Sequence, residues 1–257
     1  MGINQSLCIG CYQPKDMDLK TFCQSVADMG YKAVEIWFRD DSFDELIDAV
    51  NAAGIRLASM CAHDKLVDGL NKKENHDRIE DEILESIDVA VKHNVPGLIT
   101  FSGNRNEGQS DEEGSDVCAE GLKRVTGYAE EKGINLNMEL LNSKVNHEGY
   151  QCDHTAWGVE MCKKVDSPRA KLLYDIYHMQ IMEGDIIRTI QDNIDFIGHF
   201  HTAGNPGRNE FDDTQELNYK GICKGISETG FDLYVGHEFG PTGEDKLASL
   251  ETAFKIC

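Results

Sequence analysis

The chain has 257 residues, a formal net charge of -21 from 46 acidic and 25 basic residues, and 40% hydrophobic residues. This length fits one large domain spanning residues 1–257. The acidic balance argues against DNA or RNA as the substrate, because nucleic-acid binding needs a basic surface. No long apolar run and no leader-like start is visible. We therefore expect a cytoplasmic protein without a membrane span, with an exported form that has lost a leader as the alternative.

Short apolar runs recur along the whole chain. They are rich in Val, Ile, Leu and Phe, and most lack strict polar alternation, which is typical of parallel strands buried on both faces. The predicted strands are 6–11, 32–38, 55–61, 97–102, 134–140, 170–176, 194–201 and 231–237.

Helical patterns lie between these runs. Ile79, Ile83, Ile87 and Val91 step by four and form one apolar stripe, which predicts an amphipathic helix. Ser42 and Glu45 have the spacing of a capping box before another helix. Glycines that can adopt a left-handed cap follow three helical stretches, at Gly30, Gly54 and Gly133.

Eight strand–helix units in a chain of this length predict an α/β fold, a (β/α)8 TIM barrel formed by a single domain. A doubly wound open sheet is the alternative. That fold usually has a Gly-rich phosphate turn after an early strand, and no such turn is evident.

The nine cysteines are scattered from Cys8 to Cys257. Their odd number and spread predict reduced thiols rather than a disulfide framework. Cys8 and Cys11 have CxxC spacing, but we expect both in the first strand, where residues three apart point to opposite faces. We interpret them as buried or half-buried thiols.

Polar residues stand at the predicted ends of four consecutive strands: Glu139, Asp175, His201 and Glu238. Chemistry in such barrels occurs where strands end, and charged groups are rarely buried unless they are paired or bind a metal. Three carboxylates and one imidazole would repel each other without a cation. The set suits one divalent ion, Mg²⁺ or Mn²⁺, with Co²⁺ or Zn²⁺ as alternatives. For any one of these residues the alternative is a surface or salt-bridged position.

Four further residues are candidates near the same mouth. Glu35 ends the second predicted strand and His63 lies near the end of the third, and the sequence leaves both roles open. A turn at 206–207 would carry Arg208 over the site, where a guanidinium can hold a carboxylate or polarise a hydroxyl. His178 follows Asp175 by three residues. Taken alone, Arg208 could be a surface arginine and His178 a structural histidine.

Several segments resemble the hydroxypyruvate isomerase-like branch of the xylose isomerase-like barrels. The Tyr-Asp-Ile-Tyr-His-Met-Gln run and the Gly-Asn-Pro-Gly-Arg loop are the specific signals, and the resemblance covers most of the second half. The segments that carry it are 139–142, 173–185, 197–210, 216–219 and 236–239.

The resemblance implies that Glu139, Asp175, His201 and Glu238 bind one divalent metal ion. It also implies that Glu139 and Glu238 act as the catalytic acid–base pair, and that His178 and Arg208 contact substrate oxygens. Related ketose epimerases carry a second glutamate shortly after the first ligand, where this chain has Val145.

These observations predict an intramolecular oxidoreductase that interconverts a small α-hydroxy aldehyde and ketone through an enediolate. Hydroxypyruvate with tartronate semialdehyde, or a sugar, would be the substrate. A ketose 3-epimerase on the same fold is the nearest alternative. More distant ones are a metal-dependent abasic-site endonuclease, which would want a basic groove, and a non-enzymatic binding protein. Barrels of this kind often pair, so a homodimer is one expected assembly.

Overall fold

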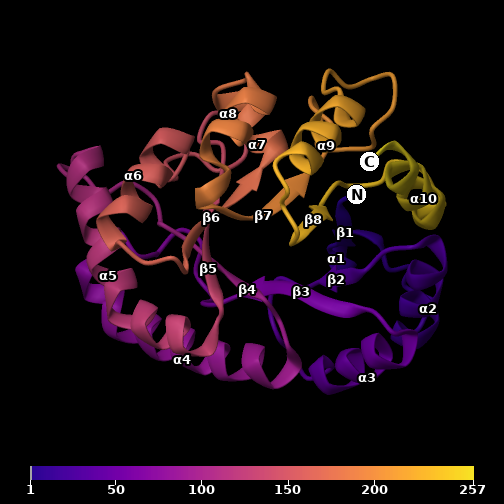
Figure 1. Ribbon diagram of the computed structural model, residues 1–257, viewed down its shortest axis with the longest axis horizontal. Helices are drawn as coiled ribbons and strands as arrows, with labels where there is room; N and C mark the ends of the chain where they lie inside the picture. Colours follow the sequence, from indigo (N-terminus) through magenta and orange to yellow (C-terminus); the bar gives the residue numbers. More distant parts are fainter. Residues whose placement is uncertain (1) are drawn as a thin grey trace.

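The computed structural model describes residues 2–257 and shows parallel strands surrounded by a layer of helices (Figure 1). The strands are β1 Asn4–Leu7, β2 Ala33–Glu35, β3 Arg56–Cys61, β4 Gly97–Thr100, β5 Asn135–Leu140, β6 Ala170–Asp175, β7 Ile197–Thr202 and β8 Tyr234–His237. The α-helices are α1 Ile9–Tyr12, α2 Leu19–Met29, α3 Phe43–Ala53, α4 His76–His93, α5 Asp111–Lys132, α6 Thr155–Val165, α7 Ile176–Met182, α8 Ile186–Asn193, α9 Tyr219–Glu228 and α10 Lys246–Ile256. Two short 3-10 helices are η1 Lys73–Asn75 and η2 Ile194–Phe196.

The sheet is a nearly closed barrel, which confirms the predicted (β/α)8 class. Its strand order is β1-β8-β7-β6-β5-β4-β3-β2, and each neighbouring pair is parallel. The seam between β1 and β2 is joined by a bridge between Cys8 and Glu35 and by a 3.0 Å hydrogen bond from Lys32 N to Gln5 O. Within residues 2–257, no helix is long and apolar enough to cross a membrane.

The first two strands are shorter than predicted. The predicted strand 6–11 was wrong at its end, because β1 stops at Leu7 and the chain turns into α1, which contains Cys11. The CxxC residues therefore lie at a strand-to-helix junction, and all nine cysteines are free thiols. β2 ends at Glu35, so Trp37 lies in the loop at the mouth of the barrel rather than in the strand.

The helices bury one face against the strands, as their periodicity predicts. Ile79, Ile83 and Ile87 of α4 are almost fully buried, whereas Val91 at its end is 42% exposed. The glycines after α2, α3 and α5 have left-handed backbone angles, which confirms the three predicted caps. The capping box predicted at Ser42 is absent, because the Ser42 side chain donates to Asp40 instead. A complete capping box stands at Ser110 before α5.

Strand register places the candidate site at the carboxyl end of the barrel. Asp175 at the end of β6 pairs with His201 of β7, and His201 pairs with Gly236 of β8. Paired residues on parallel strands point to the same face of the sheet. Glu139 lies one residue before the end of β5, and Glu238 immediately follows β8. The four candidate side chains therefore start at the same level of the barrel.

Candidate functional site

Four buried side chains meet at the mouth of the barrel. Glu139, Asp175, His201 and Glu238, hereafter the four-residue cluster, offer ligand atoms that all lie within 4.8 Å of one another. Their exposed fractions are 6%, 1%, 1% and 7%. The structure thus brings together all four residues that the strand ends predict.

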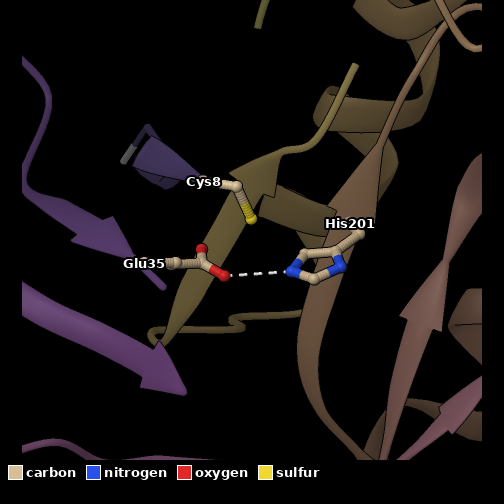
Figure 2. A group of neighbouring side chains, drawn as sticks. All are labelled: Cys8, Glu35 and His201. Carbon is tan, nitrogen blue, oxygen red and sulfur yellow. Dashed lines mark hydrogen bonds and ion pairs between the residues drawn. The ribbon is translucent and has the colours of Figure 1, made fainter. Parts of the chain in front are cut away.

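His201 presents its two ring nitrogens to different partners. Its Nε2 lies 2.9 Å from Glu35 Oε2, as Figure 2 shows. Its Nδ1 lies 3.2 Å from Glu238 Oε2 and 3.5 Å from Glu139 Oε1, yet makes no hydrogen bond. Because a carboxylate only accepts, Nε2 carries a hydrogen, and Nδ1 is the nitrogen available to a ligand.

This donor set fits a divalent cation. Three carboxylates and one imidazole nitrogen match the oxygen-rich ligands of Mg²⁺ and Mn²⁺, and the imidazole also admits Co²⁺ and Zn²⁺. The unpartnered Nδ1 of His201 is buried among carboxylate oxygens, where a cation would satisfy it. The second group of close ligand atoms, Cys8, Glu35 and His201, shares only the histidine.

The electrostatics of the cluster reflect buried negative charge. Burial raises the pKa of Glu139 and of Asp175 above their ordinary values. Burial would also raise the pKa of Glu238, but His201 and Arg208 lower it below its usual range. Burial opposes the charged form of His201, yet the Glu238 carboxylate raises the pKa of this imidazole well above its ordinary value. The cluster therefore attracts positive charge.

Arg208 lies over the cluster, as its turn predicts. Its Nη2 donates to Glu238 Oε2 at 2.5 Å and lies 3.5 Å from Asp175 Oδ2. Its guanidinium carbon is 5.6 Å from the centre of the Tyr177 ring. The Nε of Arg208 is buried and has no hydrogen-bond partner, so one N–H remains available to a ligand.

His178 is fully buried beside the same carboxylates. Its Nδ1 accepts the backbone N–H of Asn142 at 3.1 Å, so the ring hydrogen belongs to Nε2. Burial lowers the pKa of His178 well below its ordinary value, which keeps the ring neutral. The Nε2 has no hydrogen-bond partner and lies 3.6 Å from Asp175 Oδ2. His178 thus supplies a second unpartnered donor near the cluster.

A cavity of about 370 Å³ opens beside three of the four cluster residues. Its walls are mainly apolar and include aromatic side chains. The lining residues are Trp37, Phe38, Cys61, Asp64, Leu66, Ile99, Phe101, Glu139, Leu141, His147, His201, Arg208 and Glu238. A small polar molecule could enter this cavity with one end at the carboxylates and the other against the apolar wall.

Two residues with undecided roles lie outside the four-residue cluster. Glu35 is 1% exposed, and its Oε2 contacts Nε2 of His201, the ring nitrogen that does not face the cluster carboxylates. His63 is also buried, and its Nε2 accepts the backbone N–H of Phe101 at 2.9 Å, so this nitrogen is engaged by the backbone. Val145, which stands where the epimerases carry a second glutamate, is 68% exposed.

Trp37 was not predicted as a site residue. Its Nε1 donates to Glu238 Oε1 at 2.6 Å. The signal available in the sequence was its position near the end of a predicted strand.

Comparison with known proteins gives a family and several activities. The family described as xylose isomerase-like TIM barrel matches residues 23–254. A putative hydroxypyruvate isomerase of Danio rerio is 27% identical over 241 residues, covering 89% of this chain and 86% of that protein.

Two solved structures share the fold. An AP endonuclease, family 2, from Brucella melitensis has a TM-score of 0.83 at 21% identity, covering 96% of each chain. D-Psicose 3-epimerase from Clostridium cellulolyticum H10, solved with D-tagatose, has a TM-score of 0.79 at 19% identity, covering 99% of this chain and 98% of that one. Because these two names describe different reactions, likeness of fold does not select between them.

Proposed function

The chain belongs to the xylose isomerase-like TIM barrel family, and from this membership and the site we propose that it is a metal-dependent isomerase. It would interconvert a small α-hydroxy aldehyde and the matching ketone. One observation supports this most. Two carboxylates at the ends of different strands, Glu139 and Glu238, approach the same buried nitrogen of His201 beside a small cavity.

We assign Glu139, Asp175, His201 and Glu238 as the ligands of one divalent ion, Mg²⁺ or Mn²⁺ by preference. The bound ion would supply Lewis-acid polarisation of the carbonyl and the adjacent hydroxyl oxygen. Every other part of the reaction falls to the side chains of this protein.

The two glutamates serve as the acid–base pair in this proposal. One removes the proton from the carbon that bears the hydroxyl group, which gives an enediolate, and the other returns a proton to the neighbouring carbon. The hydroxyl proton passes to the former carbonyl oxygen, so that the two oxygens exchange roles. Trp37 Nε1 and Arg208 Nη2 each hold one oxygen of Glu238, at 2.6 and 2.5 Å, and so fix its orientation. A fixed carboxylate reacts with less loss of orientational freedom.

The two unpartnered donors fit substrate oxygens. Arg208 Nε and His178 Nε2 are buried without acceptors, which costs free energy unless a ligand supplies them. We assign them to oxygens of the substrate, either a carboxylate such as that of hydroxypyruvate or a sugar hydroxyl. The apolar side chains of Phe38, Leu66 and Phe101 line the cavity and favour a short compound.

A ketose 3-epimerase is the second candidate, and the placement of the two glutamates favours it. Glu139 belongs to β5 and Glu238 follows β8, and β6 and β7 lie between these strands. Carboxylates on separate sides of the cluster could remove a proton from one face of a carbon and return it from the other. The same pair of residues therefore permits both outcomes.

The homodimer that we expect from the sequence stays a prediction about the assembly of this protein.

The test is a substrate panel with the Mn²⁺-loaded protein in D2O. Hydroxypyruvate, tartronate semialdehyde, ketopentoses and ketohexoses would each be followed by NMR. We expect turnover of a short hydroxy-carbonyl compound, with solvent deuterium at the carbon that gains the hydrogen. Turnover confined to ketoses, with inversion at C3, would select the epimerase. Loaded protein that neither turns over nor exchanges any of these compounds would contradict both candidates.

A further inference from the structure

We infer that Glu35 is a positioning residue that fixes the tautomer and ring orientation of His201, so that Nδ1 faces the four-residue cluster. The inference rests on the proposed metal site. The Glu35 side chain hydrogen-bonds Ser6, His199 and His201 and none of the three cluster carboxylates. Glu35 therefore reaches the site only through His201.

The carboxylate of Glu35 crosses the barrel interior. Glu35 belongs to β2, and its Oε2 lies 2.9 Å from His201 Nε2 and 3.0 Å from His199 Nε2, both on β7. β1 and β8 separate β2 from β7 in the strand order. The side chain must therefore pass both strands to reach the histidines, and Figure 2 shows it extended toward His201.

Both intervening strands carry the residue that this path requires. Ser6 of β1 donates its hydroxyl to Glu35 Oε1. Gly236 of β8 has no side chain, and a Cβ at that position would overlap Glu35 Oε1. Glu35 is thus held by three hydrogen bonds in a slot that a glycine leaves open.

The geometry has a direct consequence for His201. Because Glu35 accepts at Nε2, the hydrogen of a neutral His201 ring resides there and the lone pair resides on Nδ1. A neutral ring in the other tautomer would direct N–H toward the position of the cation. Carboxylate partners of this kind orient metal-binding histidines and raise their basicity.

The thiol of Cys8 does not form a second metal site with Glu35 and His201. Cys8 lies close to Glu35 and His201, but the Nε2 of His201 is already engaged by Glu35. We therefore expect one ion per chain.

The test measures Mn²⁺ affinity by calorimetry in the full chain. Glu35→Gln keeps an acceptor oxygen without the charge, and Glu35→Leu removes the acceptor. We expect the Kd to rise about 10-fold in the first and about 100-fold in the second, the range seen for such partners. Asp153→Asn is the matched control, because it neutralises a buried carboxylate that belongs to no ligand group, and its affinity should stay near that of the unaltered protein.

A second readout does not depend on the metal. In uniformly ¹⁵N-labelled protein, the Nε2–H of His201 should give a downfield proton signal that exchanges slowly, and that signal should move upfield in Glu35→Gln. Gly236→Ala keeps Ser6, Glu35, His199 and His201, but its Cβ would overlap the Glu35 carboxylate and crowd the His201 ring. It should therefore weaken Mn²⁺ binding with Glu35 intact. It also serves if Glu35→Leu does not fold.

The outcomes separate the inference from the proposed function. Unaltered Mn²⁺ affinity and an unmoved His201 signal in Glu35→Gln would overturn the role of Glu35 alone. Failure of the unaltered protein to bind Mn²⁺ would overturn the proposed metal site, and the NMR signal would still decide whether Glu35 accepts the Nε2–H of His201 and so fixes the orientation of the ring. Two ions per chain, with one lost in Cys8→Ser, would overturn the inference in favour of a second site.

Discussion

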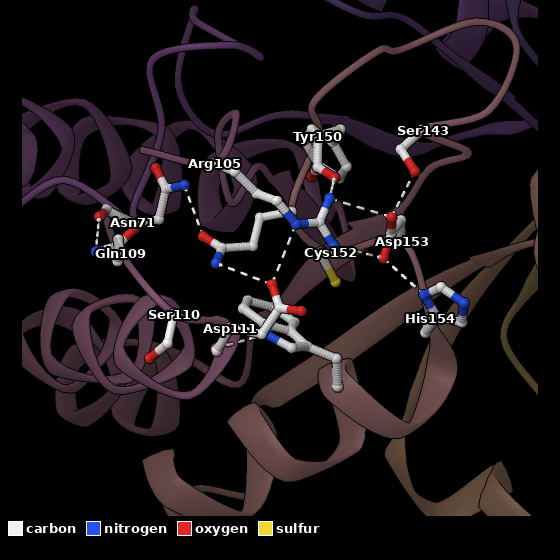
Figure 3. A network of polar contacts seen from close by, with 12 residues as sticks. Asn71, Arg105, Gln109, Ser110, Asp111, Ser143, Tyr150, Cys152, Asp153 and His154 are labelled. Atoms are coloured by element: carbon white, nitrogen blue, oxygen red, sulfur yellow. Dashed lines mark hydrogen bonds and ion pairs between the residues drawn. The ribbon is translucent and has the colours of Figure 1, made fainter. Parts of the chain in front are cut away.

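The four-residue cluster and a network around Arg105, which Figure 3 shows, both place charged groups together but give them different numbers of hydrogen-bond partners. In the Arg105 network, Asp153 Oδ1 accepts from Arg105 and lies 2.7 Å from His154 Nδ1, and Oδ2 accepts from Arg105 and from Ser143. Arg105 also bonds Asp111 at 3.1 Å. The cluster instead leaves His201 Nδ1 without a partner, beside carboxylates.

Under the proposed function, this difference separates charges that stabilise the fold from charges that bind a ligand. The Arg105 network joins the loops that follow β4 and β5, and its buried carboxylate has a donor for each oxygen. Such a network needs nothing from outside the chain. Unpartnered buried groups cost free energy. Those of His178, His201 and Arg208 lie together at the cluster, where a ligand would complete them.

The largest expected effect is on the rate. Glu139→Gln and Glu238→Gln should each lower kcat by about 10²- to 10⁴-fold, because each removes one member of the acid–base pair. Asp153→Asn is the matched control, since it neutralises a buried carboxylate outside the cavity, and the folded variant should keep most of the activity. Steady-state kinetics on the substrate found by the panel checks this, at metal concentrations that saturate each variant. Nearly full activity in either Gln variant would contradict the assignment of Glu139 and Glu238 as the acid–base pair.

Metal addition should stabilise the protein through the cluster alone. At a free Mn²⁺ concentration of 100 times the Kd, binding adds about 2.7 kcal/mol to the free energy of unfolding. We expect a higher Tm for the unaltered protein and no shift for His201→Ala. Calorimetric melting with and without a chelator measures this. An equal shift in both proteins would place the binding elsewhere.

In metal-free protein, removing charge should have opposite signs in the two regions. Asp153→Asn should lower the free energy of unfolding by about 1–2 kcal/mol, a range kept small because Arg105 is about one-third exposed. Glu139→Gln should leave it unchanged or raise it, because burial already raises the pKa of Glu139 and its charge opposes folding near neutral pH. Urea unfolding of both variants, with the midpoint urea concentration and the m-value compared, tests the sign. Destabilisation by Glu139→Gln would contradict it.

The smallest expected effect is a pH dependence of the Asp153 contribution. Burial opposes the charge of Asp153, but Arg105, Ser143 and His154 hold its pKa below the ordinary value. Its stabilising contribution is therefore complete above the unfolded pKa of about 3.9 and is lost as the pH falls through the lower folded value. The difference in free energy of unfolding between the unaltered protein and Asp153→Asn should shrink from pH 6 to pH 3. A difference that grows on acidification would be the wrong sign.

The sequence predicted the fold and the members of the cluster because both follow from local rules. Parallel strands end at one side of a barrel, so Glu139, Asp175, His201 and Glu238 could be placed together from their positions at strand ends. Predicted strand limits were too long at β1 and β2, since apolar composition continues into the helix or loop that follows.

The contacts behind and above the cluster could not be predicted in this way. Glu35 meets His201 across 166 positions of chain, and Trp37 meets Glu238 across 201. Such pairings depend on which side chains share the barrel interior, which one sequence does not reveal. Ser42 failed as a capping box for a local reason, because Asp40 competes for its hydroxyl.

The most direct test of the central claim is calorimetric titration of chelator-treated protein with Mn²⁺. The four-residue cluster predicts one ion bound per chain, with binding abolished in His201→Ala and strongly weakened in Glu139→Gln. Absence of binding by the unaltered protein, or unchanged binding in His201→Ala, would contradict it.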